Sequence, residues 1–208
     1  MDKSLISPLL IILCLCFFVT WFNKNIQSKN ITVGDYIKFG SYSQTASGQV
    51  QPIEWQVLLI ENNKMLVISR YGLETRRFDP SSQVWSNSEI RQWLNGEFYN
   101  KAFTEREKKS INLSNLSDVR TTDHVFLLSR DEAGKYFSNN EARKCEPTEY
   151  AKKNGADVRN GYIWWWLRSP DPDFSGNVYC VNIDGYIIYG NGVSYADVVV
   201  RSALWINL

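Results

Sequence analysis

The chain has 208 residues, 44% hydrophobic and 22% charged, enough for one domain with a sizeable core plus a short appendage. Its formal net charge is +1 and its basic residues are scattered, which argues against a nucleic-acid partner. Aromatic residues make up 14%, with 8 Trp and 11 Tyr, and these side chains serve both cores and binding surfaces.

The first predicted element is an uncharged run, "LISPLLIILCLCFFVTWF", at residues 5–22. A helix of roughly 18 residues is about 27 Å long, close to the hydrocarbon thickness of a bilayer. Lys3 precedes the run, Trp21 stands where an interfacial aromatic belongs, and no small-x-small cleavage pattern follows. We therefore predict one N-terminal transmembrane helix, an uncleaved signal anchor, with residues 1–30 forming anchor and linker. A buried core helix is the alternative.

The orientation of this anchor follows from its flanks. Lys3 lies on one side of the run and Lys24 and Lys29 lie on the other, so the positive-inside rule is nearly balanced. An N-terminal apolar run normally exports the chain that follows it. We therefore predict a single-pass membrane protein whose domain, residues 31–208, lies outside the cytoplasm.

Residues 31–208 begin with strand signals at 33–42, 52–60 and 65–71. The second and third of these form a hairpin through "ENNK", because Asn tolerates the left-handed conformation that a tight turn needs. Four helix starts follow, because Ser or Thr stands three residues before Glu in the capping-box pattern. These starts lie at 86–89, 104–107, 129–132 and 138–141, with a strand at 123–129 and a compact helix at 147–155 beginning with Pro147.

The last third of the chain returns to strands. The predicted strands lie at 163–169, 177–183, 185–191 and 197–208, and Asp184–Gly185 is a hairpin signal. The chain stops inside an apolar strand, so the C-terminus is predicted to be tied into the sheet. A strand pair, short helices and an antiparallel sheet together predict a single α+β domain.

The main candidate for a binding site is the stretch "GYIWWWLRSPDPDFSG", residues 161–176. Side chains alternate along a strand, so this stretch has one purely apolar face, predicted to be core: Ile163, Trp165 and Leu167. The other face suits a sugar ring, a peptide or a carboxylate and holds Trp164, Trp166 and Arg168. The alternative is that both faces are buried and that Arg168 pairs with an internal carboxylate.

Polar loops are predicted to complete this site. The segment 171–177, "DPDFSGN", resembles the first half of a calcium loop, but Asn182 stands where the bidentate Glu would be, so we predict an acidic loop tip instead. Tyr186 and Tyr195 decorate the last hairpin and the loop after it, where recognition residues are common. The predicted ligand-binding residues are Trp164, Trp166, Arg168, Asp171, Asp173, Asp184, Tyr189 and Asn191.

No catalytic constellation is present in the sequence. His124 is the single histidine, which leaves no second one for a zinc triad or a proton relay and predicts a structural role. Nucleophile-elbow, P-loop and dinucleotide motifs are missing as well. We therefore predict no catalytic residue, no metal and no cofactor. Cys145 and Cys180 are the cysteines outside the apolar run, and whether they form a disulfide stays open.

Seven ordered blocks resemble the bacterial domain of unknown function family 6273, from about residue 31 to 208. The blocks are "GDYIKFGSY", "IEWQVL", "SEIRQWLNGEFYNKAF", "VFLLSRDEAGKYF", "CEPTEYAKKNGA", "WWWLRSP" and "VRSALWINL". A more distant resemblance is to the C-type-lectin-like fold of formylglycine-generating enzymes and retroelement-diversified variable proteins. There a Trp- and Arg-bearing strand precedes a closing Arg-Pro-Ala-type strand, which Arg201 matches and Ser202, in place of Pro, does not.

This resemblance implies a domain whose ends pair, with two main helices, a loop-bearing C-terminal sheet and Arg201 as a buried structural residue. The enzyme branch of the fold uses two nearby cysteines with copper, whereas only Cys180 lies in the corresponding half here, so that activity is not carried over. Our first hypothesis is a membrane-anchored, extracytoplasmic module that binds a glycan, peptide or protein. A formylglycine-generating-type oxidoreductase relative and a structural interaction module of the cell envelope are the alternatives.

Overall fold

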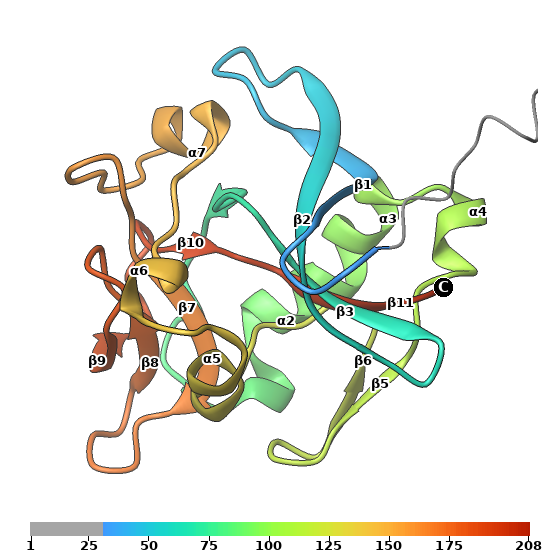
Figure 1. The fold of residues 1–208 in the computed structure, drawn as a ribbon. Coiled ribbons are helices and arrows are strands. Elements are labelled where there is room, and N and C mark those ends of the chain that lie inside the picture. The colour runs from blue at the N-terminus through green and yellow to red at the C-terminus, as the bar shows by residue number, and fades with distance from the viewer. Residues whose placement is uncertain (1–30) are drawn as a thin grey trace, which may run out of the picture. The chain divides into compact units, whose positions relative to one another are not determined.

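Two sheets and a short hairpin organise residues 31–208, the part of the chain that the computed structural model describes (Figure 1). The first sheet is antiparallel throughout, in the order β1-β2-β3-β11. Its strands are β1 (Tyr36–Ser43), β2 (Val50–Glu61), β3 (Lys64–Ser69) and β11 (Ala203–Asn207). The hairpin predicted at 61–64 is confirmed, since Asn62 and Asn63 both have positive φ and Glu61 pairs with Lys64.

The second sheet has the order β4-β10-β7-β8-β9. Its strands are β4 (Glu74–Thr75), β10 (Val199–Val200), β7 (Trp165–Pro170), β8 (Asn177–Val181) and β9 (Ile187–Gly192). All neighbours are antiparallel except β10 and β7. The hairpin is formed by β5 (Ser114–Leu116) and β6 (Thr121–Asp123). The described residues therefore form the α+β domain that the sequence predicts.

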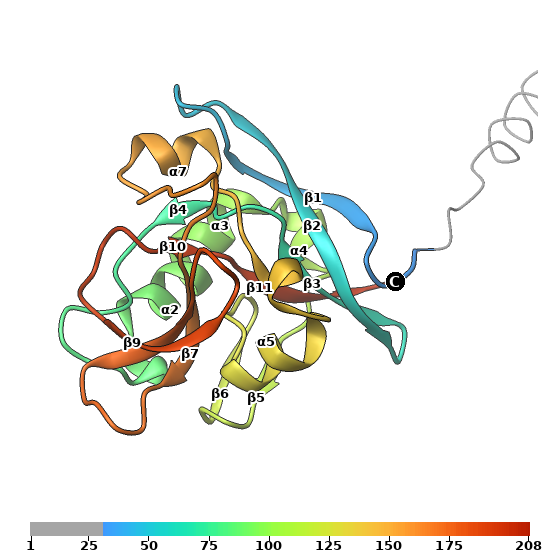
Figure 2. The same cartoon turned by 60° about the vertical axis from the view of Figure 1, so that its left-hand side comes forward.

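The last predicted strand, 197–208, is wrong as a single element, because it is split between the two sheets. Both views show β10 and β11 as successive parts of one segment that leads from the second sheet to the first (Figures 1 and 2). Arg201 lies at the break, is 3% exposed and donates to the carbonyls of Ser69 (3.0 Å) and Arg143 (3.2 Å). Its burial agrees with what the family resemblance implies. These hydrogen bonds fix the chain at the point where it leaves the second sheet and enters the first.

The two ends of the domain do not pair directly, contrary to the implication of the lectin-like resemblance. Strand β11 pairs with β3, so the C-terminus is tied into the sheet as predicted. Strand β1 lies at the opposite edge, because β2 and β3 stand between it and β11. The first and last strands thus share a sheet without touching.

Short helices fill the two chain segments that connect the second sheet with the β5–β6 hairpin. They are η1 (Trp85–Asn87), α2 (Glu89–Trp93), the π-helical turn η2 (Leu94–Phe98), α3 (Tyr99–Ala102), α4 (Glu105–Lys108), α5 (Arg130–Tyr136), α6 (Asn140–Arg143) and α7 (Glu149–Lys153). The capping boxes predicted at 104–107 and 129–132 are confirmed at the starts of α4 and α5.

The other helix starts differ from the prediction by one or two residues. Ser88 rather than Ser86 caps α2, because Ser86 lies within η1. Asn139 rather than Ser138 caps α6, and Thr148 caps α7, so Pro147 precedes that helix instead of opening it. In each case the observed cap accepts a backbone hydrogen bond from the first turn, which is the interaction that defines a helix start.

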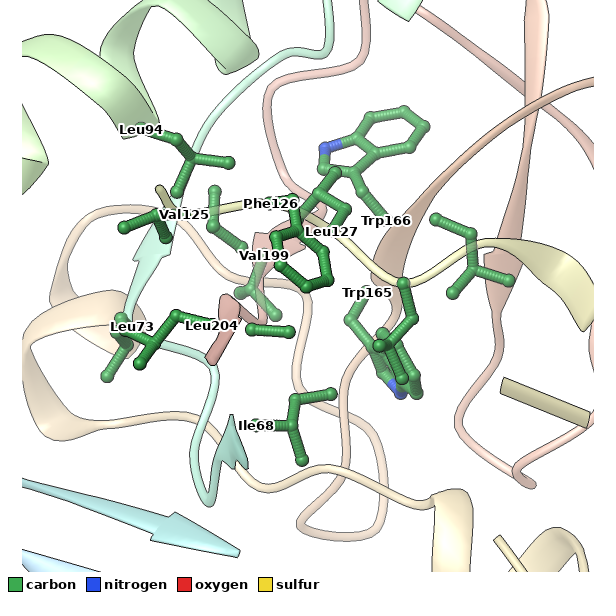
Figure 3. Close-up of a cluster of buried hydrophobic side chains, with 14 of the residues drawn as sticks. Ile68, Leu73, Leu94, Val125, Phe126, Leu127, Trp165, Trp166, Val199 and Leu204 are labelled. Atoms are coloured by element: carbon green, nitrogen blue, oxygen red, sulfur yellow. The ribbon is translucent and has the colours of Figure 1, made fainter. Parts of the chain in front are cut away.

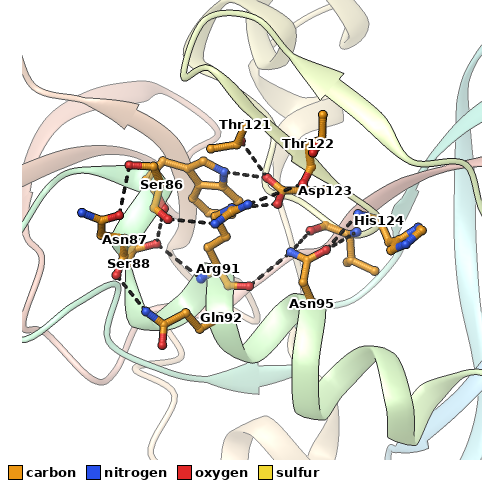
Figure 4. Close-up of polar contacts among 12 residues, drawn as sticks. Ser86, Asn87, Ser88, Arg91, Gln92, Asn95, Thr121, Thr122, Asp123 and His124 are labelled. Carbon is orange, nitrogen blue, oxygen red and sulfur yellow. Dashed lines mark hydrogen bonds and ion pairs between the residues drawn. The ribbon is translucent and has the colours of Figure 1, made fainter.

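The strand predicted at 123–129 is wrong beyond Asp123, where β6 ends. The Asn95 side chain takes the place of a neighbouring strand (Figure 4). Its Oδ1 accepts from the amides of His124 (2.8 Å) and Val125 (3.2 Å). Its Nδ2 donates to the Val125 carbonyl (2.9 Å). Buried backbone groups need partners, and Asn95 supplies them without a ladder. The segment then crosses the core with one isolated bridge, between Phe126 and Ala203.

The core lies around β7. Trp165, Trp166 and Leu167 are all 0% exposed, and Ile163 is buried as well. Figure 3 shows Trp165 and Trp166 projecting in opposite directions from β7 into a cluster that includes Phe126 and Leu127. The prediction that Ile163, Trp165 and Leu167 belong to the core is therefore confirmed. Both faces of the strand are buried because side chains from other segments pack against each of them, while β10 and β8 cover its two edges.

Within residues 31–208 no helix is long and apolar enough to cross a membrane. The apolar run predicted to be the anchor, 5–22, lies outside the described residues.

Candidate functional site

Arg168 and Trp166 belong to the interior and not to a surface. The Trp166 indole donates to the Arg76 carbonyl (2.7 Å). Arg168 donates in bidentate fashion to Asp118 (3.0 and 2.9 Å) and also to Glu132 (2.6 Å). Burial alone would lower the pKa of the Arg168 guanidinium, but the hydrogen bonds to the two carboxylates outweigh it and raise the pKa. Arg168 is thus charged and fully engaged, as in the alternative in which it pairs with internal carboxylates.

Trp164, one residue before β7, is the member of the tryptophan row that reaches a surface hollow. The hollow has a volume of about 190 Å³ and is lined by Asp157, Arg159, Trp164, Tyr195, Asp197 and Val198. Trp164 is half-buried and Tyr195 is 55% exposed. We call this the Trp164 hollow. Its lining combines two aromatic rings with three charged groups.

Two backbone features bring the walls of the Trp164 hollow together. The Val199 amide donates to the Trp164 carbonyl (3.0 Å), which ties the segment before β7 to β10 and therefore to the 195–198 loop. On the other wall, Arg159 and Tyr162 exchange two backbone hydrogen bonds (2.9 and 3.0 Å) around Asn160 and Gly161. Both central residues have positive φ, as a type I′ turn requires, so this Asn-Gly pair sets the position of Arg159.

The charges of the Trp164 hollow are unequally matched. Arg159 donates to Asp157 (Nε–Oδ2, 2.9 Å) and forms an ion pair with it (2.7 Å). The hydrogen bond to Asp157 raises the pKa of Arg159, and the charge of Asp197 raises it further. Asp197 is exposed, and within residues 31–208 no hydrogen bond or ion pair engages its carboxylate. Two carboxylates and one guanidinium leave the lining with a formal charge of −1.

The remaining predicted site residues are not gathered around Trp164. Asp171 is 1% exposed and accepts from the Asp173 amide (3.0 Å), so it is an internal part of the 171–177 loop. Asp173 and Asp184 are exposed on separate turns. The side chain of Asn191 lies outside what the structure describes. Among residues 31–208, no group of three or more His, Cys, Asp or Glu side chains is placed to hold a metal ion.

Tyr189, 60% exposed, lines a second hollow together with Arg130, Asp131, Gly134, Tyr179 and Ile187. The rings of Tyr179 and Tyr189 are 5.3 Å apart, and the Arg130 guanidinium lies 5.0 Å from the centre of the Tyr179 ring. This second hollow is built by β8, β9 and the start of α5. The predicted site residues Trp164 and Tyr189 therefore line two separate hollows.

Cys145 and Cys180 are buried thiols and form no disulfide. Burial raises the pKa of Cys145, which keeps the thiol protonated and makes it a poor nucleophile. His124 is half-buried, and its ring stacks on Tyr99 with centroids 4.8 Å apart. These placements offer no support for a cysteine-based oxidation mechanism.

Asp157, Arg159 and Asp197 were missed as candidates by sequence reasoning. The Asn160–Gly161 pair is a hairpin signal that could have identified Arg159 as a positioned residue. Nothing local indicates that 157–164 and 195–198 meet, because the hydrogen bond between Trp164 and Val199 that joins them spans a large sequence separation.

The comparison with known families covers most of this domain. The family described as Domain of unknown function (DUF6273) matches residues 62–208, which include every residue that lines the Trp164 hollow and leave out β1 and β2. No curated protein and no solved structure matches the chain. Since the matched range is well over half of the 208 residues, the chain belongs to this family of domains of unknown function.

Proposed function

We propose that residues 31–208 form a ligand-binding module and that the Trp164 hollow is its site. The observation that supports the proposal is the juxtaposition of Trp164 and Tyr195 with three charged side chains in one concavity. Ligand sites combine apolar or aromatic walls with a few polar groups that set orientation. A volume of about 190 Å³ is below the few hundred Å³ typical of pockets for drug-sized molecules, so the hollow suits one sugar ring or one peptide side chain.

The proposal includes a C-type-lectin-like arrangement and a membrane anchor. The lectin-like interpretation is supported by the loop-bearing second sheet, because the loops that line the hollow lead directly into its strands β7 and β10. The anchor at 5–22 and the extracytoplasmic position rest on the apolar run and its flanks. In this arrangement the module presents its hollow to ligands outside the cytoplasm.

Binding tests the proposal directly. The purified full chain is screened on glycan and peptide arrays, and the affinity of any ligand found is measured for Trp164→Ala and Tyr195→Ala. Each substitution removes an aromatic wall, and we expect a loss of roughly three- to thirty-fold, the value of one aromatic contact to a ligand. Tyr186→Ala, which removes an exposed Tyr outside both hollows, is the matched control and should bind like the wild type.

Folded Trp164→Ala and Tyr195→Ala proteins with undiminished affinity would contradict the site. A ligand lost only in Tyr189→Ala would move the site to the second hollow. Capture of proteins alone, with no glycan or peptide bound, would favour the structural interaction module.

Protease accessibility tests the proposed location. The full chain is expressed in a bacterial host, and intact spheroplasts are treated with protease. Because a short tail before an apolar run normally stays inside, we expect digestion of residues 31–208 while a cytosolic marker remains whole. Full protection of the domain until the spheroplasts are lysed would place it in the cytoplasm.

A further inference from the structure

We propose that the Trp164 hollow selects an alkylammonium group, as carried by a lysine side chain or an amino sugar. This inference rests on the proposed function, because it names the ligand chemistry of the same site. It is carried by the charge balance and by the aromatic walls of the hollow.

The first argument is the unmatched carboxylate. Arg159 forms its hydrogen bond and ion pair with Asp157, at 2.9 and 2.7 Å, and interacts with Asp197 through charge alone. Asp197 is therefore the carboxylate available to a ligand. A cation in the hollow restores charge balance. An anion would meet a net negative lining and would have to displace Asp157 from Arg159.

The second argument is that aromatic side chains line the hollow. The faces of Trp and Tyr rings attract cations through their quadrupoles, and Trp does so most strongly. Trp164 and Tyr195 line the same hollow as Asp197, so an ammonium group can contact a ring and the carboxylate together. A neutral sugar would use the rings and leave the charge of Asp197 unpaired.

Nuclear magnetic resonance of the tryptophan indoles can detect ligand binding at this site in the full chain. The protein has eight Trp, and the Trp164 indole signal is identified by its loss in Trp164→Phe. The probes are Nα-acetyl-lysine amide, its Nε-acetylated neutral counterpart, methyl glucosaminide, its N-acetylated counterpart, and Nα-acetyl-glutamate amide. The two matched pairs separate a side-chain source of the ammonium from a sugar source.

We expect saturable shifts of the Trp164 signal with at least one of the two ammonium probes. Acetylation should weaken binding by roughly 5- to 30-fold, because it removes both the cation–π contact and the pairing with Asp197. The glutamate probe should leave the Trp164 signal in place. Binding of the ammonium probe should also weaken as salt rises, since the carboxylate is exposed.

Charge variants give effects of opposite sign. Asp197→Asn should weaken binding of the ammonium probe by roughly two- to five-fold, and Arg159→Gln should strengthen it, because the lining becomes more negative. Asp184→Asn is the matched control: it removes an exposed carboxylate from the β8–β9 turn, keeps a residue suited to that turn, and should change nothing.

The outcomes separate this inference from the proposed function. Neutral and ammonium probes that shift Trp164 equally would overturn the selection of a cation and leave the binding site standing. Weaker binding in Arg159→Gln together with binding of the glutamate probe would overturn it in favour of an anion. If neither these probes nor any ligand found on the arrays shifts the Trp164 signal, both the inference and the proposed site fail.

Discussion

Replacing Trp165 by alanine should lower the free energy of unfolding by about 3–5 kcal/mol, the usual cost of removing a large buried aromatic side chain. Trp165 is 0% exposed and its indole donates to the Arg143 carbonyl at 3.1 Å. Its ring also lies 5.0 Å from the guanidinium of the buried Arg201. The substitution therefore opens a cavity, removes one of the two side-chain hydrogen bonds to the Arg143 carbonyl and takes a favourable contact from a buried cation.

Urea denaturation of the full chain, followed by circular dichroism, measures this effect. In a thermal scan the same loss corresponds to a fall in melting temperature of about 10 °C, at roughly 2–4 °C per kcal/mol for a chain of this size. Trp164→Ala is the matched control, because the neighbouring indole is half-buried at the Trp164 hollow and should cost less than half as much. Equal losses for the two variants would mean that Trp164 is also part of the core.

Replacing Arg168 by methionine should cost about 3 kcal/mol, at the lower end of the range for breaking a buried ion pair. The Arg168 side chain is 3% exposed, whereas its partners Asp118 and Glu132 keep side-chain exposures of 41% and 26%. Once Arg168 is gone, water can reach both carboxylates, which limits the penalty. Arg168→Lys should recover only part of the loss, because an ammonium cannot reproduce the bidentate bond to Asp118.

The same denaturation experiment checks Arg168, with Arg106→Met as the control. Arg106 is an exposed residue of α4, and its replacement should change the free energy of unfolding by no more than about 0.5 kcal/mol. An Arg168→Met protein as stable as the wild type would contradict the structural role of the guanidinium. The folded fraction of the Arg168→Met protein should keep its affinity for a ligand of the Trp164 hollow, because Arg168 does not line that hollow.

Interactions between residues close in sequence were predictable. The capping boxes at Thr104–Glu107 and Ser129–Glu132 each depend on atoms within three residues, and the tight turns at 61–64 and 184–185 depend on residues that accept positive φ. Gly185 is doubly required, since a Cβ there would lie 1.7 Å from the Asn140 carbonyl oxygen. The apolar alternation of Ile163, Trp165 and Leu167 likewise placed one face of β7 in the core.

Contacts between distant segments decided the rest. The face of β7 that holds Trp166 and Arg168 is buried because other segments cover it, and alternation within one strand cannot tell a covered face from an open one. Asn95 replaces a strand neighbour for 124–125, and Arg201 splits the last strand through carbonyls that are remote in sequence. The Trp164 hollow exists because the bond from Val199 to Trp164 brings two loops together. The residue types of a binding site were visible in the sequence, whereas their grouping required the folded chain, because that grouping depends on long-range hydrogen bonds and packing.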